Sequence, residues 1–425
     1  MPQSLDRTKR IFTDLTNACS KSTLEERLKP RGKNKFPLPK RVPVPNDSTS
    51  EGLQTRQEFF REMGHSINFL TGSQPPVKPE AIVGNIESQI GYTSMPVGAI
   101  GPLRINGAYA QGDFYVPMAT TEGALIASYN RGANIISLSG GVTTACIADS
   151  IFRAPVFVFN NLSEVSQFMG WLLPNVENFH EIVSAHTRFG KLIDVKTTIN
   201  DSTVWLTFEY TTGDAAGQNM VTICTDAICR YIVEKSPVKP RIWFLDGNMS
   251  GDKKATVLAF QSNRGKKVLA EVVVPRRIVQ RFLHTEPERM QEFYKVTNRG
   301  ALQSGGIGVQ GHFANALAAV YIACGQDAAC VSESAVGMTN LEVREDGSMY
   351  VSASLPNLTV GTVGGGTHLP TARECLQMLD CAGAGNAKKF AEIVAATVLS
   401  GEISIVGAFS AGHFARAHAT HRHKL

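Results

Sequence analysis

Two acidic residues lie alone in long stretches of small and apolar residues. Glu122 is the only acid in residues 114–148, and Asp327 is the only formally charged residue in residues 300–330. Burial disfavours the charged form of a carboxyl, and a carboxyl that stays protonated can act as a general acid. We therefore expect Glu122 to be buried and Asp327 to lie in an interior helix. For either residue alone, a structural carboxyl hydrogen-bonded to a helix cap or to the backbone explains the pattern equally well.

A lysine pair can supply a cation to these carboxyls. Lys253 and Lys254 follow Gly247 and Gly251 in the segment GNMSGDKK. The glycines leave the backbone free to turn an ammonium group into a cleft. An exposed, solvated pair of lysines is the alternative explanation.

Three glycine-rich segments are candidate phosphate sites. TGDAAGQN, at 212–219, follows a predicted strand and opens a predicted helix, so its amides and the positive helix end face one point. GIGVQG, at 306–311, has the spacing of a dinucleotide fingerprint, but no strand precedes it, and we reject that interpretation. In GTVGGGTHLP, from Gly361, the glycines indicate a close approach of the backbone to a ligand.

Four histidines lie near the C-terminal end, in AGHFARAHATHRHKL: His413, His418, His421 and His423. Such a cluster can bind a metal ion, although no acid or cysteine lies near it in the sequence. A tail that brings one imidazole to a cleft as a proton donor is the alternative. The residues alone leave both explanations open.

Composition limits the class of protein. The chain has 425 residues, 43% of them hydrophobic and 19% charged, enough for two or three domains. We expect a cytoplasmic, soluble protein without a membrane partner, because no run of eighteen apolar residues occurs and MPQSLDRTKR lacks the apolar stretch of a signal peptide. The eight cysteines never form C-x-x-C, which indicates neither disulfides nor bound metal. The basic stretch 29–41 is interpreted as a solvated linker rather than a nucleic-acid-binding arm.

The elements that must position these groups follow from periodicity. Residues 155–245 predict a ferredoxin-like βαββαβ unit. Its elements are a strand at 156–159, a helix from Leu162 with a Ser163 cap, strands at 192–199 and 203–210, a helix with Ile223, Ile228 and Ile232 on one face, and a strand at 242–245.

The predicted fold class is α+β. A large Ala/Gly-rich domain of helices and sheet comprises residues 81–154 and 246–425, and the ferredoxin-like unit, 155–245, is inserted into it. Residues 1–80, with proline-rich and polar stretches, form a small N-terminal region.

Seven segments in chain order resemble motifs of one family, the 3-hydroxy-3-methylglutaryl-CoA reductases. The resemblance extends from about Glu87 to His418. The segments are ESQIGYTSMPVGAIGPL, MATTEGALIASYNRG, TGDAAGQNM, GNMSGDKK, ACGQDAA, VGTVGGGT and SGEISIVGAFSAGHFARAH.

The resemblance implies roles for individual residues. The catalytic positions are Glu122, Lys253, Asp327 and His418. The substrate-binding positions are Arg153, Asp252, Lys254, Lys295, Asn315, Asn130 and Arg131. Of these, Arg153 and Lys254 match positions that hold the substrate's carboxylate. The cofactor-binding positions are Thr187, Arg188, Asp214, Ala216, Gly217, Gln218, Asn219, Gln326, Gly364 and Gly365.

The implied reaction is the four-electron reduction of 3-hydroxy-3-methylglutaryl-CoA to mevalonate and CoA with two NADPH and no metal. The inserted domain would bind NADP and the large domain the substrate and CoA. Arg188 favours NADPH over NADH, because a guanidinium can pair with a 2′-phosphate. The family's chemistry implies that Lys253 stabilises an oxyanion, that Asp327 holds Lys253 and Glu122 in one network, and that His418 protonates the leaving thiolate.

In the family the lysine loop comes from a neighbouring subunit, which implies a homodimer or tetramer. Two positions depart from the family's pattern: Asp246 replaces a serine, and Gln218 replaces an apolar residue. An extra carboxylate near an anionic substrate weakens binding unless a cation offsets it. The alternatives are an NADH-linked degradative reductase running in reverse, a catalytically inactive binding relative, and a Rossmann dehydrogenase that would rest on GIGVQG alone.

Overall fold

The structure, a computed structural model, describes residues 5–412 and is organised by a ten-stranded sheet. Its main strand order is β7-β4-β6-β3-β8-β10-β9, with β1 on β3, β2 on β1 and β5 on β6. The strands are β1 Val97–Gly107, β2 Gln111–Ala119, β3 Val142–Arg153, β4 Val156–Val158, β5 Leu192–Asn200, β6 Thr203–Tyr210, β7 Ile242–Phe244, β8 Gly265–Val274, β9 Met338–Val343 and β10 Met349–Leu358.

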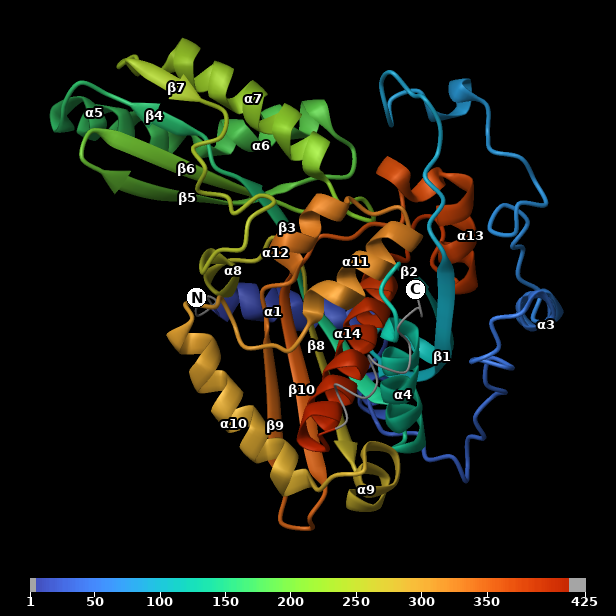
Figure 1. Ribbon diagram of the computed structural model, residues 1–425. Coiled ribbons are helices and arrows are strands. Elements are labelled where there is room, and N and C mark those ends of the chain that lie inside the picture. Colours follow the sequence, from blue (N-terminus) through green and yellow to red (C-terminus); the bar gives the residue numbers. More distant parts are fainter. Residues whose placement is uncertain (1–4, 413–425) are drawn as a thin grey trace.

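Strand β3 joins two parts of the molecule. It pairs with β8 over residues 143–150 and with β6 over residues 151–153, antiparallel in both cases. Arg153, the last residue of β3, therefore lies where the two parts meet. Figure 1 shows the smaller part, β4 to β7 with α5 to α7, projecting from the larger one.

The smaller part has the strand order β7-β4-β6-β5 with antiparallel neighbours, the arrangement of a split βαββαβ unit. Its helices are α5 Leu162–Leu172, α6 Val176–His186 and α7 Gln218–Lys235. Two details of the prediction are wrong. Asn161, not Ser163, caps α5, because its Oδ1 accepts a hydrogen bond from the backbone N–H of Glu164 at 3.0 Å. Ile223 is 57% exposed, because Val221, Cys224, Ile228, Cys229 and Ile232 form the buried face of α7.

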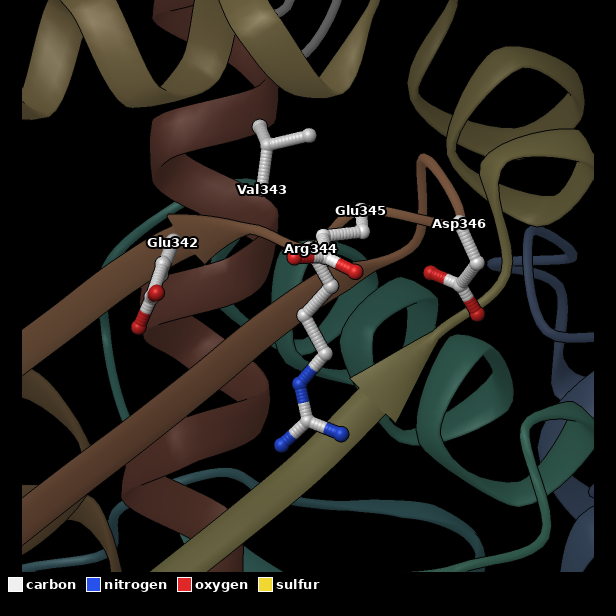
Figure 2. Close-up of a pocket in the computed structure, with 5 residues that line it drawn as sticks. All are labelled: Glu342, Val343, Arg344, Glu345 and Asp346. Atoms are coloured by element: carbon white, nitrogen blue, oxygen red, sulfur yellow. The ribbon is translucent and has the colours of Figure 1, made fainter.

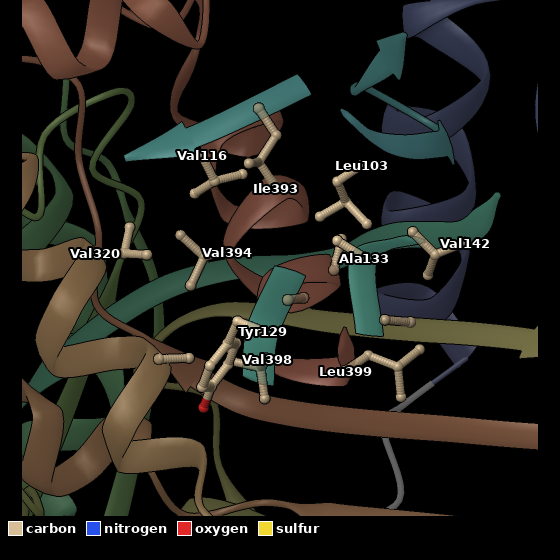
Figure 3. Close-up of a cluster of buried hydrophobic side chains, with 14 of the residues drawn as sticks. Leu103, Val116, Tyr129, Ala133, Val142, Val320, Ile393, Val394, Val398 and Leu399 are labelled. Carbon is tan, nitrogen blue, oxygen red and sulfur yellow. The ribbon is translucent and has the colours of Figure 1, made fainter. Parts of the chain in front are cut away.

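The larger part is built around helix α14, Ala387–Ser410 (Figure 1). Figure 3 shows Ile393, Val394, Val398 and Leu399 of this helix in one apolar cluster with side chains of β1, β2, β3, α4 and α11. Within residues 5–412, α14 is the one helix long and apolar enough to cross a membrane, yet 89% of its most apolar window is buried inside the fold. The remaining α-helices are α1 Leu5–Ala18, α2 Lys21–Arg27, α3 Ser50–Glu62, α4 Leu125–Leu138, α8 Leu258–Gln261, α9 Arg276–Leu283, α10 Pro287–Gln303, α11 Phe313–Ala323, α12 Val331–Ser334 and α13 Pro370–Met378.

The N-terminal segment is joined to both parts by an ion pair and by hydrogen bonds to backbone carbonyl oxygens. Arg7 of α1 pairs with Glu209 of β6 at 2.5 Å, and Glu209 is 1% exposed. The buried guanidinium of Arg104 donates to the carbonyl oxygens of Arg31 and Phe36. Arg31 itself donates to the carbonyl oxygen of Ile105, and its burial lowers the pKa of its guanidinium. The prediction of a solvated basic linker is therefore wrong for Arg31.

Candidate active site

An ion pair between Lys253 and Asp327 lies at the centre of the candidate site. Lys253 Nζ is 2.8 Å from Asp327 Oδ2, and both side chains are close to half exposed. The hydrogen bond to Asp327 raises the pKa of Lys253. Burial raises the pKa of Asp327, but hydrogen bonds from Lys253 and from the backbone N–H of Ala329 outweigh it and leave that pKa below its usual value. Both groups are therefore charged at neutral pH.

The prediction that Asp327 lies in an interior helix is wrong. Helix α11 ends at Ala323, and Asp327 is the exposed N-cap of the short 3-10 helix Ala328–Cys330. Gly325, with φ +64°, turns the chain between the two helices. Ala323 and Cys324 are buried, and the turn that follows them brings the carboxylate to the surface.

The loop that carries Lys253 is fastened to a buried charge network. The backbone N–H of Lys253 donates to Glu333 Oε2 at 3.2 Å. Glu333 pairs with Arg264 at 2.8 Å, and Arg264 pairs with Asp252 at 2.6 Å. Lys253 has φ +56°, a conformation that costs a non-glycine residue about 1 kcal/mol or more and persists only where contacts enforce it.

These contacts lie within one chain. Lys253 pairs with Asp327 of its own chain, and the loop is anchored at both Asp252 and Lys253 by Arg264 and Glu333. Both members of the ion pair at the centre of the site therefore belong to the same chain. The expectation that the lysine loop completes the site of a neighbouring subunit stays a prediction.

Glu122 and Asn315 form a second pair. Asn315 Nδ2, on α11, donates to Glu122 Oε2 at 3.2 Å. Glu122 is exposed rather than buried, because it lies in the turn between β2 and α4. Within residues 5–412 the Glu122 side chain is hydrogen-bonded to Asn315 and not to Lys253 or Asp327, so the expected single network consists of two separate pairs.

Arg153 holds two carboxylates. Its Nη1 is 2.8 Å from Asp246 Oδ2 and 3.0 Å from Asp252 Oδ2, and its Nη2 donates to Thr222 Oγ1 at 2.9 Å. The cation that the unusual Asp246 requires is thus Arg153, the residue predicted to bind the carboxylate of the substrate.

The predicted anion site forms at the start of α7. Gly217, the N-cap residue, has φ +83°, and a side chain there would meet Thr212 Cγ2 at 2.2 Å, so only glycine fits. Asp214 is engaged within the fold: its carboxylate accepts hydrogen bonds from the N–H groups of Gly385 and Ala387 at the start of α14. Its carbonyl oxygen accepts a hydrogen bond from the N–H of Thr362 at 2.8 Å.

Two further segments, the glycine-rich loop from Gly361 and the loop after α6, lie against the start of α7. The N–H of Gly361 donates to Gln326 Oε1 at 2.8 Å, and a side chain at Gly361 would meet Ala216 N at 2.6 Å. In the loop after α6, Thr187 Oγ1 accepts a hydrogen bond from the N–H of Gly190. A side chain at Gly190 would meet Met220 of α7, so this loop, with its exposed Arg188, lies beside the helix start.

Gln218, the second departure from the family's pattern, has polar partners. Its Nε2 donates to Cys330 Sγ at 2.9 Å, and its Oε1 is 3.4 Å from Arg264 Nη2. The side chain thus connects α7 with the network beneath Lys253. Burial raises the pKa of the Cys330 thiol, which keeps it neutral.

The other predicted site residues lie as follows. Asn130 Oδ1 accepts a hydrogen bond from the N–H of Gly101, and Arg131 donates to Ser404, so both side chains join α4 to its neighbours. Lys254 and Lys295 are exposed, and their roles stay predictions together with those of Asn219, Gly364 and Gly365. His418 lies outside the described residues.

A surface hollow at the β9–β10 turn is unrelated to these groups. Figure 2 shows its lining, five consecutive residues from Glu342 to Asp346. None of them belongs to the candidate site.

Sequence reasoning missed Arg264 and Glu333. Arg264 stands in SNRGKK, where three basic residues within four indicate an exposed stretch, and yet its side chain is 1% exposed. Glu333, in VSESAVG, had a usable signal: it is a lone acid among small residues, like Glu122.

The chain is similar to known proteins over most of its length. The family model described as hydroxymethylglutaryl-coenzyme A reductase matches residues 52–423. The 3-hydroxy-3-methylglutaryl-coenzyme A reductase of Pyrococcus horikoshii is 46% identical over 350 residues, which cover 80% of this chain and 84% of that protein. That of Aeropyrum pernix is 46% identical over 340 residues, covering 79% and 80%.

A solved structure has a similar fold. The class II 3-hydroxy-3-methylglutaryl-CoA reductase of Streptococcus pneumoniae, bound to NADPH in open conformations, aligns with a TM-score of 0.66 and 17% identity. The alignment covers 84% of this chain and 96% of that one.

Proposed function

Because the chain belongs to the hydroxymethylglutaryl-coenzyme A reductase family, a family of oxidoreductases, we propose that it reduces 3-hydroxy-3-methylglutaryl-CoA to mevalonate and CoA with two NADPH per turnover. The observation that carries the proposal is the 2.8 Å ion pair between Lys253 and Asp327. It supports a charged ammonium group held ready for an oxyanion, which thioester reduction requires.

The start of α7 supports binding of a phosphorylated dinucleotide. Helix N-termini bind phosphate through free N–H groups, and the exposed guanidinium of Arg188 lies beside this one. NADPH, when bound, supplies the hydride. The residues that would hold it are Thr187, Arg188, Asp214, Ala216, Gly217, Gln218, Asn219, Gln326, Gly364 and Gly365.

The chain's own side chains handle charge and protons. The ammonium of Lys253 stabilises the negative charge that develops on the thioester oxygen, and Asp327 keeps that ammonium charged and in position. Glu122 gives a proton to the alkoxide of the second reduction, and His418 protonates the CoA thiolate so that it cannot add back. Because Glu122 is exposed, the bound substrate or a second subunit has to exclude water around it.

The substrate's carboxylate is assigned to Arg153 and Lys254, with Asp252, Lys295, Asn315, Asn130 and Arg131 completing the substrate site. Exposed apolar side chains in the segment 83–97, among them Ile86, Ile90 and Tyr92, support a homodimer or tetramer. The proposed location is the cytoplasm.

The test is NADPH oxidation by the purified protein with 3-hydroxy-3-methylglutaryl-CoA, with released thiol titrated in parallel and the assay repeated with NADH. Two NADPH consumed per thiol support the proposal. A preference for NADH favours the degradative alternative. A folded protein that consumes neither cofactor, in either direction, contradicts the proposal and favours the inactive relative.

A further inference from the structure

Arg153 is a buried cation, and one of its N–H donors has no partner among the described residues. The residue is 9% exposed, and the Nε atom is buried without a hydrogen-bond partner among the described residues. Nη1 is shared by Asp246 and Asp252, and Nη2 is used by Thr222. A guanidinium offers its donors as a planar fork that fits a carboxylate bidentately. In Arg153, Nε has no partner among the described residues and Nη1 is shared by two carboxylates, so no carboxylate is bound bidentately.

The two carboxylates on Nη1 are held differently. Asp252 is 16% exposed, and its other oxygen, Oδ1, pairs with the buried Arg264 at 2.6 Å. Asp246 is 36% exposed, and among residues 5–412 its other oxygen accepts a hydrogen bond only from the N–H of Asn248, within its own turn. Moving Asp252 away would take a carboxylate from two buried guanidinium groups, those of Arg153 and Arg264, whereas Asp246 can turn outward into water. Asp246 is therefore the exchangeable ligand of Arg153.

Charge balance makes this exchange necessary. One guanidinium already faces two carboxylates, and a third on the same side would add repulsion between like charges at short range. A carboxylate-bearing acyl-CoA that binds Arg153 therefore has to displace one of them.

We propose that Asp246 is a built-in competitor for the carboxylate of the substrate: it occupies Arg153 in the free protein, moves away when substrate binds, and thereby lowers the affinity for carboxylate-bearing ligands. The inference rests on the proposed function in assigning Arg153 to the substrate's carboxylate. Asp246 thus lowers the affinity for the substrate without taking part in the reduction.

The experiment compares wild type with Asp246→Asn and Asp246→Ser, in steady-state turnover and in calorimetric titration with the free dicarboxylate 3-hydroxy-3-methylglutarate. Both variants should lower KM and the dissociation constant of the dicarboxylate by about three- to tenfold, with kcat unchanged. The matched control is Asp201→Asn. It removes the same charge from the exposed β5–β6 turn, where φ +51° suits asparagine equally well, and it should change neither constant.

The outcomes separate the inference from the proposed function. A wild type without turnover removes the proposed function, but the calorimetric comparison still decides the inference. Equal or weaker dicarboxylate binding by Asp246→Asn overturns it, because Asp246 would then orient Arg153 or be irrelevant to it. In an Arg153→Gln background, adding Asp246→Asn should leave the dissociation constant of the dicarboxylate unchanged. A change that persists in this background also overturns the inference.

Discussion

Arg264 and Glu333 form an ion pair in which both side chains are 1% exposed, directly beneath the loop that carries Lys253. Burial raises the pKa of Glu333 in spite of the opposing effect of Arg264. Each member has further partners: Arg264 donates to Asp252 and to the carbonyl oxygen of Phe152, and Glu333 accepts from Thr359. The pair thus connects the stability of the fold to the position of the candidate catalytic lysine.

Breaking this pair should reduce both stability and turnover. Arg264→Met leaves the carboxylate of Glu333 buried without its cation, which costs about 3–5 kcal/mol of unfolding free energy. Urea denaturation and NADPH oxidation measure the two effects. The double variant Arg264→Met, Glu333→Leu should regain part of the stability but not the turnover, because replacing Glu333 removes the acceptor of the Lys253 N–H. Turnover restored along with stability would contradict a positioning role.

The ion pair of Lys253 should matter for chemistry and little for folding. Lys253→Ala should abolish reduction of both the thioester and added mevaldehyde, while the unfolding free energy changes by less than about 1 kcal/mol, because the pair is close to half exposed. Asp327→Asn should retain the fold and lose most turnover. Lys235→Ala, at the exposed end of α7, is the control. Substantial turnover by Lys253→Ala would remove the oxyanion role.

Cofactor preference should depend on Arg188. Arg188→Ala should raise the KM for NADPH at least tenfold, about 1.4 kcal/mol or more, and leave the KM for NADH nearly unchanged, since only NADPH carries the 2′-phosphate. Arg230→Ala removes an exposed guanidinium from α7 and should affect neither cofactor. Equal losses for both cofactors would contradict the assignment.

The pH dependence of the unfolding free energy should include a contribution from Glu392. Burial raises the pKa of this α14 carboxyl to about 7, in spite of hydrogen bonds from the N–H groups of Tyr109, Ala110 and Cys146. A carboxyl whose pKa is raised in the folded state stabilises the fold fully below pH 4.5, and this contribution is lost as the pH rises through about 7. Relative to Glu392→Gln, wild type should lose roughly 3 kcal/mol of unfolding free energy over that interval.

Glu402, further along the same helix, is the matched comparison. Burial raises the pKa of its carboxyl, but His312 and the N–H groups of Gly311 and His312 outweigh burial and lower it. Glu402 therefore stabilises the fold at pH values above the usual pKa of a glutamate, and this stabilisation is lost as the pH falls. The difference in unfolding free energy between wild type and Glu402→Gln should therefore shrink as the pH falls. The same pH trend for both variants would contradict the assigned shifts.

The order of proton transfers can be tested at His418. His418→Gln should slow reduction of the thioester far more than reduction of added mevaldehyde, because only the first half-reaction releases a thiolate. Stopped-flow measurement of NADPH oxidation with each substrate gives the two rates. Equal losses in both half-reactions would count against this role.

Local sequence determined much of the smaller part of the fold. The alternation at 203–210 and the turn before it predicted β6 within its observed bounds, Thr203–Tyr210. The segment TGDAAGQN, at 212–219, was predicted to open a helix, and α7 begins within it at Gln218, with Gly217 as its left-handed N-cap residue. The family motifs also identified Lys253, Asp327, Glu122 and Asn315, which the structure brings together as two pairs.

Only the tertiary structure decided which carboxyls are buried. A lone acid among small and apolar residues singled out Glu122, which is exposed, whereas Glu392 and Glu402, in the same kind of sequence, are buried within α14. Their carboxylates are stabilised by backbone N–H groups of loops distant in sequence, at Tyr109 and Gly311, which no local pattern can reveal. Arg264 likewise has the sequence surroundings of a surface residue, and yet it is a buried cation, because its partners are also distant in sequence. The energy of a charge depends on partners that only folding supplies.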